Sequence, residues 1–187
     1  MSLQTTGSDL DGFKAALGSL AASVNVITMW DEDQKPLGMT ATAFSSVSVD
    51  PLLVVVCINR STRTYEYIEK TKRFGVNILG SVSREISDYC SRQGADKYLK
   101  PEWMSHQSEW HCPALSGALA FLDCEIDQNI SAGTHAVLIG AVRGIGLNAA
   151  AQHHEPLLHF RGAYRQLQED THRMRPRPLP IILDGLT

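Results

Sequence analysis

The hydrophobic and polar positions near the start of the chain predict a helix followed by a β-hairpin. Apolar residues recur at helical spacing over residues 8–22, and Ser8 with Asp11 has the spacing of a capping box. β-Forming residues at Val24–Trp30 are followed by the polar turn Asp31–Pro36. This order predicts two strands joined by a turn.

The middle of the chain alternates between apolar strands and short helices. The uninterrupted apolar run Leu52–Ile58 predicts a strand that is buried on both faces. Thr64–Lys72 reads as a short helix, Phe74–Leu79 as a strand and Ser81–Arg92 as another helix. Gly94–Gly117 then loses its periodicity and is expected to be a long surface excursion, whose two tryptophans indicate packing.

The last part of the pattern predicts further strands. Phe121–Ile130 alternates, with apolar residues on one face and acidic residues, among them Asp123, on the other. His135–Leu147 is a long apolar strand whose three glycines are expected at bends or bulges, and Pro156–Phe160 and Ala163–Leu167 close the β part. Many strands and few helices favour an antiparallel barrel over a doubly wound sheet.

Composition restricts the class of protein. Of 187 residues, 43% are hydrophobic and 20% charged, which is ordinary for a globular protein. The net charge of −3 argues against nucleic acid as the main partner, and no apolar run approaches the ~20 residues that a membrane helix needs. The beginning of the sequence lacks a signal-peptide pattern, so a cytoplasmic location and no membrane partner are expected.

The chain is expected to form one domain. We expect a flexible N-terminus at 1–8, a folded domain at 9–167 and a Pro/Arg-rich arm at 168–187, loose or lying on a partner subunit. The four cysteines form no CxxC pair and are expected to be reduced thiols.

Most of the candidate ligand-binding residues lie in Gly38–Thr64. Its first part, Met39–Ala43, contains a run of Thr and Ala whose small side chains let another molecule approach the backbone. After the apolar strand comes a polar turn, Asn59–Thr64, with hydroxyls and two arginines at the start of a predicted helix. Helix N-terminal N–H groups, the helix dipole and guanidinium charge suit a phosphate, although such a turn can also be no more than a helix cap.

The same stretch, with Phe74–Leu79 and Gly133-Thr134-His135 after it, resembles the flavin reductase-like family. Its members are the small partners of two-component flavin monooxygenases and are built on the FMN-binding split barrel. The resemblance runs from about residue 13 to residue 167 and rests on the ordered set of motifs. It implies an antiparallel split β-barrel, mainly β with short helices, that acts as a homodimer.

The resemblance also implies an activity. The chain would reduce FMN or FAD with NADH or NADPH, by hydride transfer to flavin N5, and would supply reduced flavin to a partner monooxygenase. The residues expected to bind the flavin are Met39, Thr40, Ala41, Thr42, Ser45, Ser46, Cys57, Asn59, Arg60, Ser61, Thr62, Thr64 and Arg92.

Three further residues are expected on the side of the hydride donor. By resemblance, His135 lies beside the nicotinamide as the catalytic residue, although Thr134 stands where the family commonly carries Asp. Phe160 and Tyr164 lie in the closing strands, where the family often places an aromatic near the flavin. Both are equally credible as core residues.

Two other functions stay open at this point. One is a flavoprotein of the same fold that retains FMN as an oxidase or electron carrier. The other is a non-catalytic flavin- or haem-binding module. Gly144–Ala149 matches the dinucleotide motif GxGxxA but lacks a βαβ unit, and the histidines have no acidic or cysteine partner at ligand spacing, so neither a Rossmann site nor a metal site is expected.

Overall fold

The computed structural model describes residues 9–94, 97–106, 109–151 and 153–167. The predicted N-terminal segment and C-terminal arm lie outside these residues. In chain order the elements are α1 (Leu10–Gly18), β1 (Ala22–Ser23), β2 (Asn25–Trp30), β3 (Pro36–Ala41), β4 (Phe44–Val49), β5 (Leu52–Asn59), α2 (Arg63–Thr71), β6 (Arg73–Leu79), η1 (Ser81–Ser83), α3 (Arg84–Cys90), η2 (Pro101–Trp103), β7 (Ala118–Ala132), β8 (His135–Leu147), η3 (Ala149–Ala151), β9 (Leu158–Phe160) and β10 (Ala163–Arg165).

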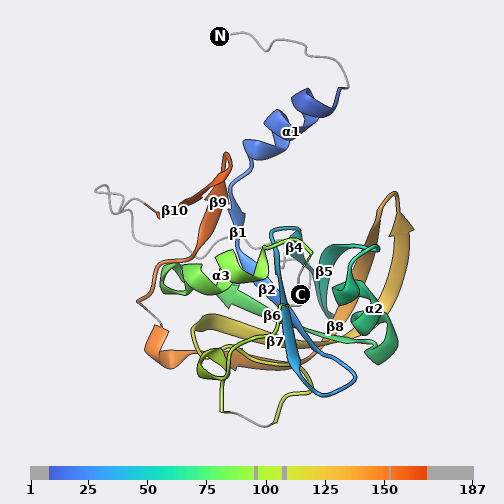
Figure 1. Ribbon diagram of the computed structural model, residues 1–187, viewed down its shortest axis with the longest axis vertical. Coiled ribbons are helices and arrows are strands. Elements are labelled where there is room, and N and C mark those ends of the chain that lie inside the picture. The colour runs from blue at the N-terminus through green and yellow to red at the C-terminus, as the bar shows by residue number, and fades with distance from the viewer. Residues whose placement is uncertain (1–8, 95–96, 107–108, 152, 168–187) are drawn as a thin grey trace.

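Two antiparallel sheets form the body of the protein, and the prediction of a mainly β antiparallel fold is confirmed. The larger sheet has seven strands in the order β3-β2-β6-β7-β8-β5-β4, and the smaller has the order β1-β9-β10. The link between the two edge strands β3 and β4 folds back across β5, where Cys57 N donates to Ala43 O at 3.1 Å. Figure 1 shows the small sheet between α1 and the larger sheet.

The main core lies against the larger sheet, with α2 packed on it. Ile27, Val56 and Leu138 are fully buried there together with Ile68 of α2. Gly140 makes room for the buried ring of Phe74, because a Cβ at Gly140 would lie 2.5 Å from Phe74 Cζ. A larger residue would therefore displace the centre of the core.

Strand β5 corrects the prediction that Leu52–Ile58 is buried on both faces. Val54, Val56 and Ile58 are buried, whereas the residues between them are only half-buried. One face of this strand meets the core and the other is left partly open, so the apolar run arises without burial on both sides.

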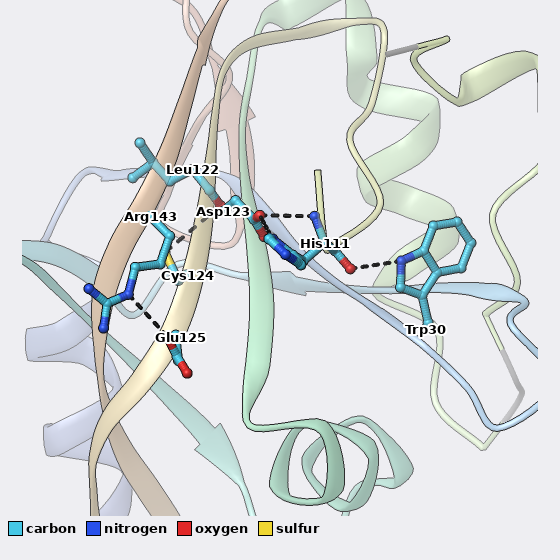
Figure 2. A network of polar contacts seen from close by, with 7 residues as sticks. All are labelled: Trp30, His111, Leu122, Asp123, Cys124, Glu125 and Arg143. Atoms are coloured by element: carbon cyan, nitrogen blue, oxygen red, sulfur yellow. Dashed lines mark hydrogen bonds and ion pairs between the residues drawn. The ribbon is translucent and has the colours of Figure 1, made fainter. Parts of the chain in front are cut away.

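The excursion between α3 and β7 is attached to the sheet by a buried carboxylate (Figure 2). Asp123 Oδ2 accepts from the main-chain N of His111 at 2.9 Å and lies 3.0 Å from His111 Nδ1, while Trp30 Nε1 donates to His111 O at 3.0 Å. Asp123 is only 3% exposed. The acidic face of the predicted strand is therefore partly covered, because the excursion buries Asp123.

Helix α1 is shorter than predicted and does not pack on the body. Its N-cap is Asp9, whose carboxylate accepts from Gly12 N, in place of the predicted box at Ser8 and Asp11. The helix extends away from the two sheets in Figure 1, and none of its residues is buried. Within the described ranges, no helix has the length and apolar character to cross a membrane.

The GxGxxA match at Gly144–Ala149 does not have the setting of a dinucleotide site. Both glycines lie in β8, which is antiparallel to β7, and only the three-residue turn η3 follows. Gly144 instead accommodates Trp110, because a Cβ there would lie 2.4 Å from the indole ring. This setting differs from the βαβ unit that the motif requires.

Candidate functional site

A pocket of about 640 Å³ lies where three separate segments meet. Strand β3 contributes one wall, the turn between β5 and α2 a second, and the end of α3 with the following segment a third. The described lining residues are Leu37, Gly38, Met39, Thr40, Asn59, Ser61, Thr62, Arg63, Thr64, Cys90, Ser91, Arg92, Gln93, Gly94 and Lys97. The volume suits a small organic ligand.

The turn that forms the second wall is held by its own side chains. Asn59 Oδ1 accepts from the N and Oγ of Ser61 at 3.0 and 2.9 Å. Thr62 Oγ1 donates to Asn59 O at 2.8 Å and accepts from Tyr65 N at 3.2 Å, so Thr62 is the N-cap of α2. The amide of Thr64 then belongs to the first turn of α2, at the wall of the pocket.

The edge of β3 presents main-chain groups to the same pocket. Gly38 N donates to Lys97 O at 3.0 Å, so Gly38 directs its polar groups away from β2. Because the direction repeats every second residue in an antiparallel strand, Thr40 also directs its N–H and C=O away from β2. The Thr40 side chain is occupied separately, since its hydroxyl donates to Ser87 O at 2.7 Å.

The charges around the pocket all have one sign in the described lining. Arg63, Arg92 and Lys97 line it, and the described lining residues include no carboxylate. The Arg92 guanidinium lies over the Tyr89 ring at 5.2 Å. Burial lowers the pKa of Lys97. Such a lining favours a ligand that carries negative charge.

A second groove of about 640 Å³ adjoins the pocket and shares Thr40 and Ser91 with it. Tyr164 and His159 of the small sheet line this groove, with their rings 6.1 Å apart. The Tyr164 hydroxyl lies 2.7 Å from Ser87 Oγ, and burial raises the pKa of Tyr164. The pocket and the groove therefore meet at Thr40, whose hydroxyl is joined through Ser87 to Tyr164.

Most of the predicted flavin-binding residues line one of these two hollows. Met39, Thr40, Asn59, Ser61, Thr62, Thr64 and Arg92 line the pocket, and Thr42 lines the groove beside it. Ala41, Ser45, Ser46, Cys57 and Arg60 line neither.

The residues outside the hollows have other surroundings. Ser45 and Ser46 are exposed on β4, and Ser45 Oγ donates to Ser46 O. Arg60 is directed to the β7–β8 hairpin, where its guanidinium donates to Gly133 O at 2.6 Å. Of the two predicted aromatics, Tyr164 lines the groove, whereas Phe160 does not and is half-buried beside Arg161.

His135 lies at the first position of β8, next to the turn rather than in either hollow. It pairs with Asn59 across the β5–β8 ladder and is exposed. The Thr134 hydroxyl lies 2.9 Å from His135 Nδ1. The structure thus brings His135 close to Asn59 and gives its ring a hydroxyl neighbour.

On the third wall of the pocket, sequence reasoning identified Arg92 and missed its neighbours. Ser91, Gln93 and Lys97 also line it. Ser91 lies in the last turn of the predicted helix, and Gln93 and Lys97 lie beyond its end. The basic residues Arg92 and Lys97, on either side of Gly94, were a possible signal for an anion site. Sequence reasoning could not place Lys97 beside β3, because the hydrogen bond between Gly38 and Lys97 joins positions 59 residues apart (97 minus 38).

Known proteins that resemble this chain are flavin reductases and reductase subunits. A family model described as a flavin reductase like domain matches residues 17–168. A probable flavin reductase of Rhizobium meliloti (strain 1021) is 34% identical over 143 residues, which make up 75% of this chain and 45% of the relative. The reductase subunit HsaB of a flavin-dependent monooxygenase from Mycobacterium tuberculosis (strain H37Rv) is 30% identical over 158 residues, covering 84% of this chain and 82% of that subunit.

A solved structure agrees with these relatives. The flavin reductase PheA2 in its native state is 34% identical and superposes with a TM-score of 0.74, over 86% of this chain and 99% of the other. The chain spans about half the length of the first two curated relatives, 45% and 46%. Since the family model covers most of the chain, this protein belongs to the flavin reductase-like family.

Proposed function

We propose that this protein reduces FMN or FAD with NADH or NADPH and supplies the reduced flavin to a partner monooxygenase. The observation that carries the proposal is the pocket where the edge of β3, the N-terminus of α2 and three cations meet. Relatives named as monooxygenase reductase components support the same function.

The described residues fit the two polar parts of a flavin nucleotide. The N–H and C=O of Thr40 at the edge of β3 suit the alternating donors and acceptors of the pyrimidine ring. The first-turn amides of α2 and the Ser61 hydroxyl suit a phosphate, with Arg92 opposite. Met39 and Thr42 border the ring side in this arrangement.

When bound, the flavin supplies a hydride acceptor at N5. The protein's own task is to place the donor against it and to limit access of water. The groove that shares Thr40 with the pocket is the proposed donor side, with Tyr164 on its wall. We also propose that His135 helps to position the donor, from the hairpin next to Asn59.

We also propose that the protein acts as a homodimer in the cytoplasm. On α1, Leu10, Phe13 and Leu17 are 64%, 61% and 55% exposed, and a helix with such an apolar row gains free energy when a second subunit covers it. The four cysteines are free thiols, in keeping with a reducing compartment. Sedimentation at several protein concentrations tests the dimer, and a monomer at every concentration would contradict it.

Steady-state oxidation of NADH and NADPH, with FMN, FAD and riboflavin as acceptors, tests the function. The proposal predicts a rate that rises with the concentration of added free flavin. A protein that stays yellow through dialysis and gains nothing from added flavin would indicate a retained cofactor. Tight flavin binding without oxidation of either nucleotide would indicate a binding module instead.

A further inference from the structure

A lysine outside the predicted set supplies a cation to the flavin pocket. Lys97 lines the pocket, and its side chain is half-buried. Its main-chain carbonyl accepts from Gly38 N at 3.0 Å, which fixes the position of its Cα against the edge of β3. The site of this charge is therefore set by backbone pairing, in contrast to a charge on a free surface loop.

The Lys97 side chain belongs to the β3 side of the pocket. Its ammonium group interacts electrostatically with the Cys90 thiol, and Cys90 Sγ lies 2.8 Å from where a Cβ of Gly38 would be. Thr40, whose main-chain groups are directed into the pocket, follows only two residues later, about 7 Å along the strand. The phosphate-binding turn, in contrast, comes from the separate wall formed by β5 and α2.

The chemistry of the proposed reaction changes the charge of the ring and leaves that of the phosphate unchanged. The C4–H bond of the dihydronicotinamide breaks and an N5–H bond forms, with both electrons going to the flavin. The nicotinamide leaves as a cation, and the flavin ring gains one negative charge, shared by N1 and the C2 carbonyl. A cation fixed beside the pyrimidine ring stabilises this product more than the oxidised ring.

We propose that the Lys97 ammonium group pairs with the N1–C2=O edge of the flavin ring and selectively stabilises the reduced flavin. This inference rests on the proposed function. It is supported by the lining, in which no described residue is a carboxylate that could neutralise Lys97. Burial also lowers the pKa of Lys97, so an anionic partner restores stabilisation that the charged form loses on burial.

The test compares the affinity for oxidised and reduced flavin. Dissociation constants for FMN and riboflavin are measured in both oxidation states under anaerobic conditions, for the wild type and for Lys97→Met, Lys97→Arg and Lys100→Met. Lys97→Met keeps the aliphatic stem and removes the charge. Lys100→Met makes the same change at an exposed lysine that lies over the Trp103 ring and outside the pocket.

Lys97→Met is expected to weaken reduced flavin about tenfold more than oxidised flavin, for FMN and riboflavin alike. For a two-electron couple, that ratio lowers the potential of the bound flavin by about 30 mV. Lys97→Arg is expected to retain most of the preference, and Lys100→Met all of it. Thermal unfolding of each variant shows whether the fold is kept.

Two results would overturn the inference while leaving the function intact. Equal weakening of both oxidation states would mean that Lys97 only shapes the pocket. A loss confined to FMN, with riboflavin unchanged, would assign Lys97 to the phosphate. If the wild-type protein binds no flavin in either state, the proposed function fails, and this inference fails with it.

Discussion

The hydroxyl of Thr40 donates a hydrogen bond to the main-chain carbonyl of Ser87 at 2.7 Å, and so ties the edge strand β3 to helix α3. The hydroxyl of Ser87, which is fully buried, lies 2.7 Å from the hydroxyl of Tyr164. One residue of α3 therefore links the edge of the larger sheet to the smaller sheet. Thr40 lines both the pocket and the groove of the candidate site, and Tyr164 lines the groove.

Thr40→Val tests this link, because it removes the hydroxyl and keeps the shape of the side chain. The variant loses one hydrogen bond to a carbonyl that still accepts from Ser91 N, so we expect the free energy of unfolding to fall by about 1 kcal/mol. Thr42→Val is the matched control, because Thr42 is exposed. Denaturant titration of both variants measures the difference, and equal effects would show that the Thr40 bond contributes nothing.

Asp31 gives the stability of the hairpin between β2 and β3 a dependence on pH. Its carboxylate accepts from Lys35 N at 2.8 Å, from Asp33 N at 2.9 Å and from the Tyr98 hydroxyl at 3.1 Å. These bonds, first of all that from Lys35, hold the pKa of Asp31 below its ordinary value of 3.8. The native state thus binds this proton less readily than the unfolded state does.

The sign of the pH effect follows from this lowered pKa. The stabilisation by Asp31 is present above about pH 4 and is lost as pH falls through the lowered pKa. Asp31→Asn should therefore be less stable than the wild type at neutral pH, with the gap closing towards pH 2. Urea unfolding at several pH values measures the gap, and a gap that stays constant would refute the account. Asp33→Asn, at an exposed carboxylate, is the control.

Two glycines of β8 should respond differently to the same added methyl group. A Cβ at Gly140 would lie 2.5 Å from Phe74 Cζ in the core, whereas one at Gly146 would meet its nearest neighbour, Trp110, at 3.4 Å. Gly140→Ala is expected to cost about 1–3 kcal/mol of unfolding free energy, and Gly146→Ala less than about 0.5 kcal/mol. Thermal unfolding compares the pair, and equal losses would contradict the packing described for Phe74.

Local sequence signals predicted the parts of the fold that depend on neighbours in the chain. The turn after Trp30 and the helix that begins after Thr62 follow from turn and capping residues within a few positions. The burial of Asp123 was not predicted, because its partner, His111, lies in a stretch without periodicity. Burial by a distant segment leaves no mark on the alternation of the strand itself.

In the candidate site too, local contacts were predictable from the sequence and long-range contacts were not. The hydroxyl turn was predictable, because Asn59 to Thr62 form their bonds among themselves. Lys97 was not, since its place in the pocket depends on pairing with Gly38. Arg60 suits a phosphate by its position in the sequence, but in the structure its guanidinium donates to Gly133 O of another hairpin.

The central claim is that the turn at the start of α2 holds the phosphate of a flavin whose ring lies along β3. Its most direct test is the affinity for FMN and for riboflavin, which lacks the phosphate, in a Ser61→Ala, Arg92→Ala double variant. Arg143→Ala is the control, because Arg143 pairs with Glu125 on the sheet and lies outside the pocket. We predict that the double variant binds FMN at least about tenfold more weakly while riboflavin changes less than about twofold. Equal losses for the two ligands would contradict the claim and leave the turn as a helix cap only.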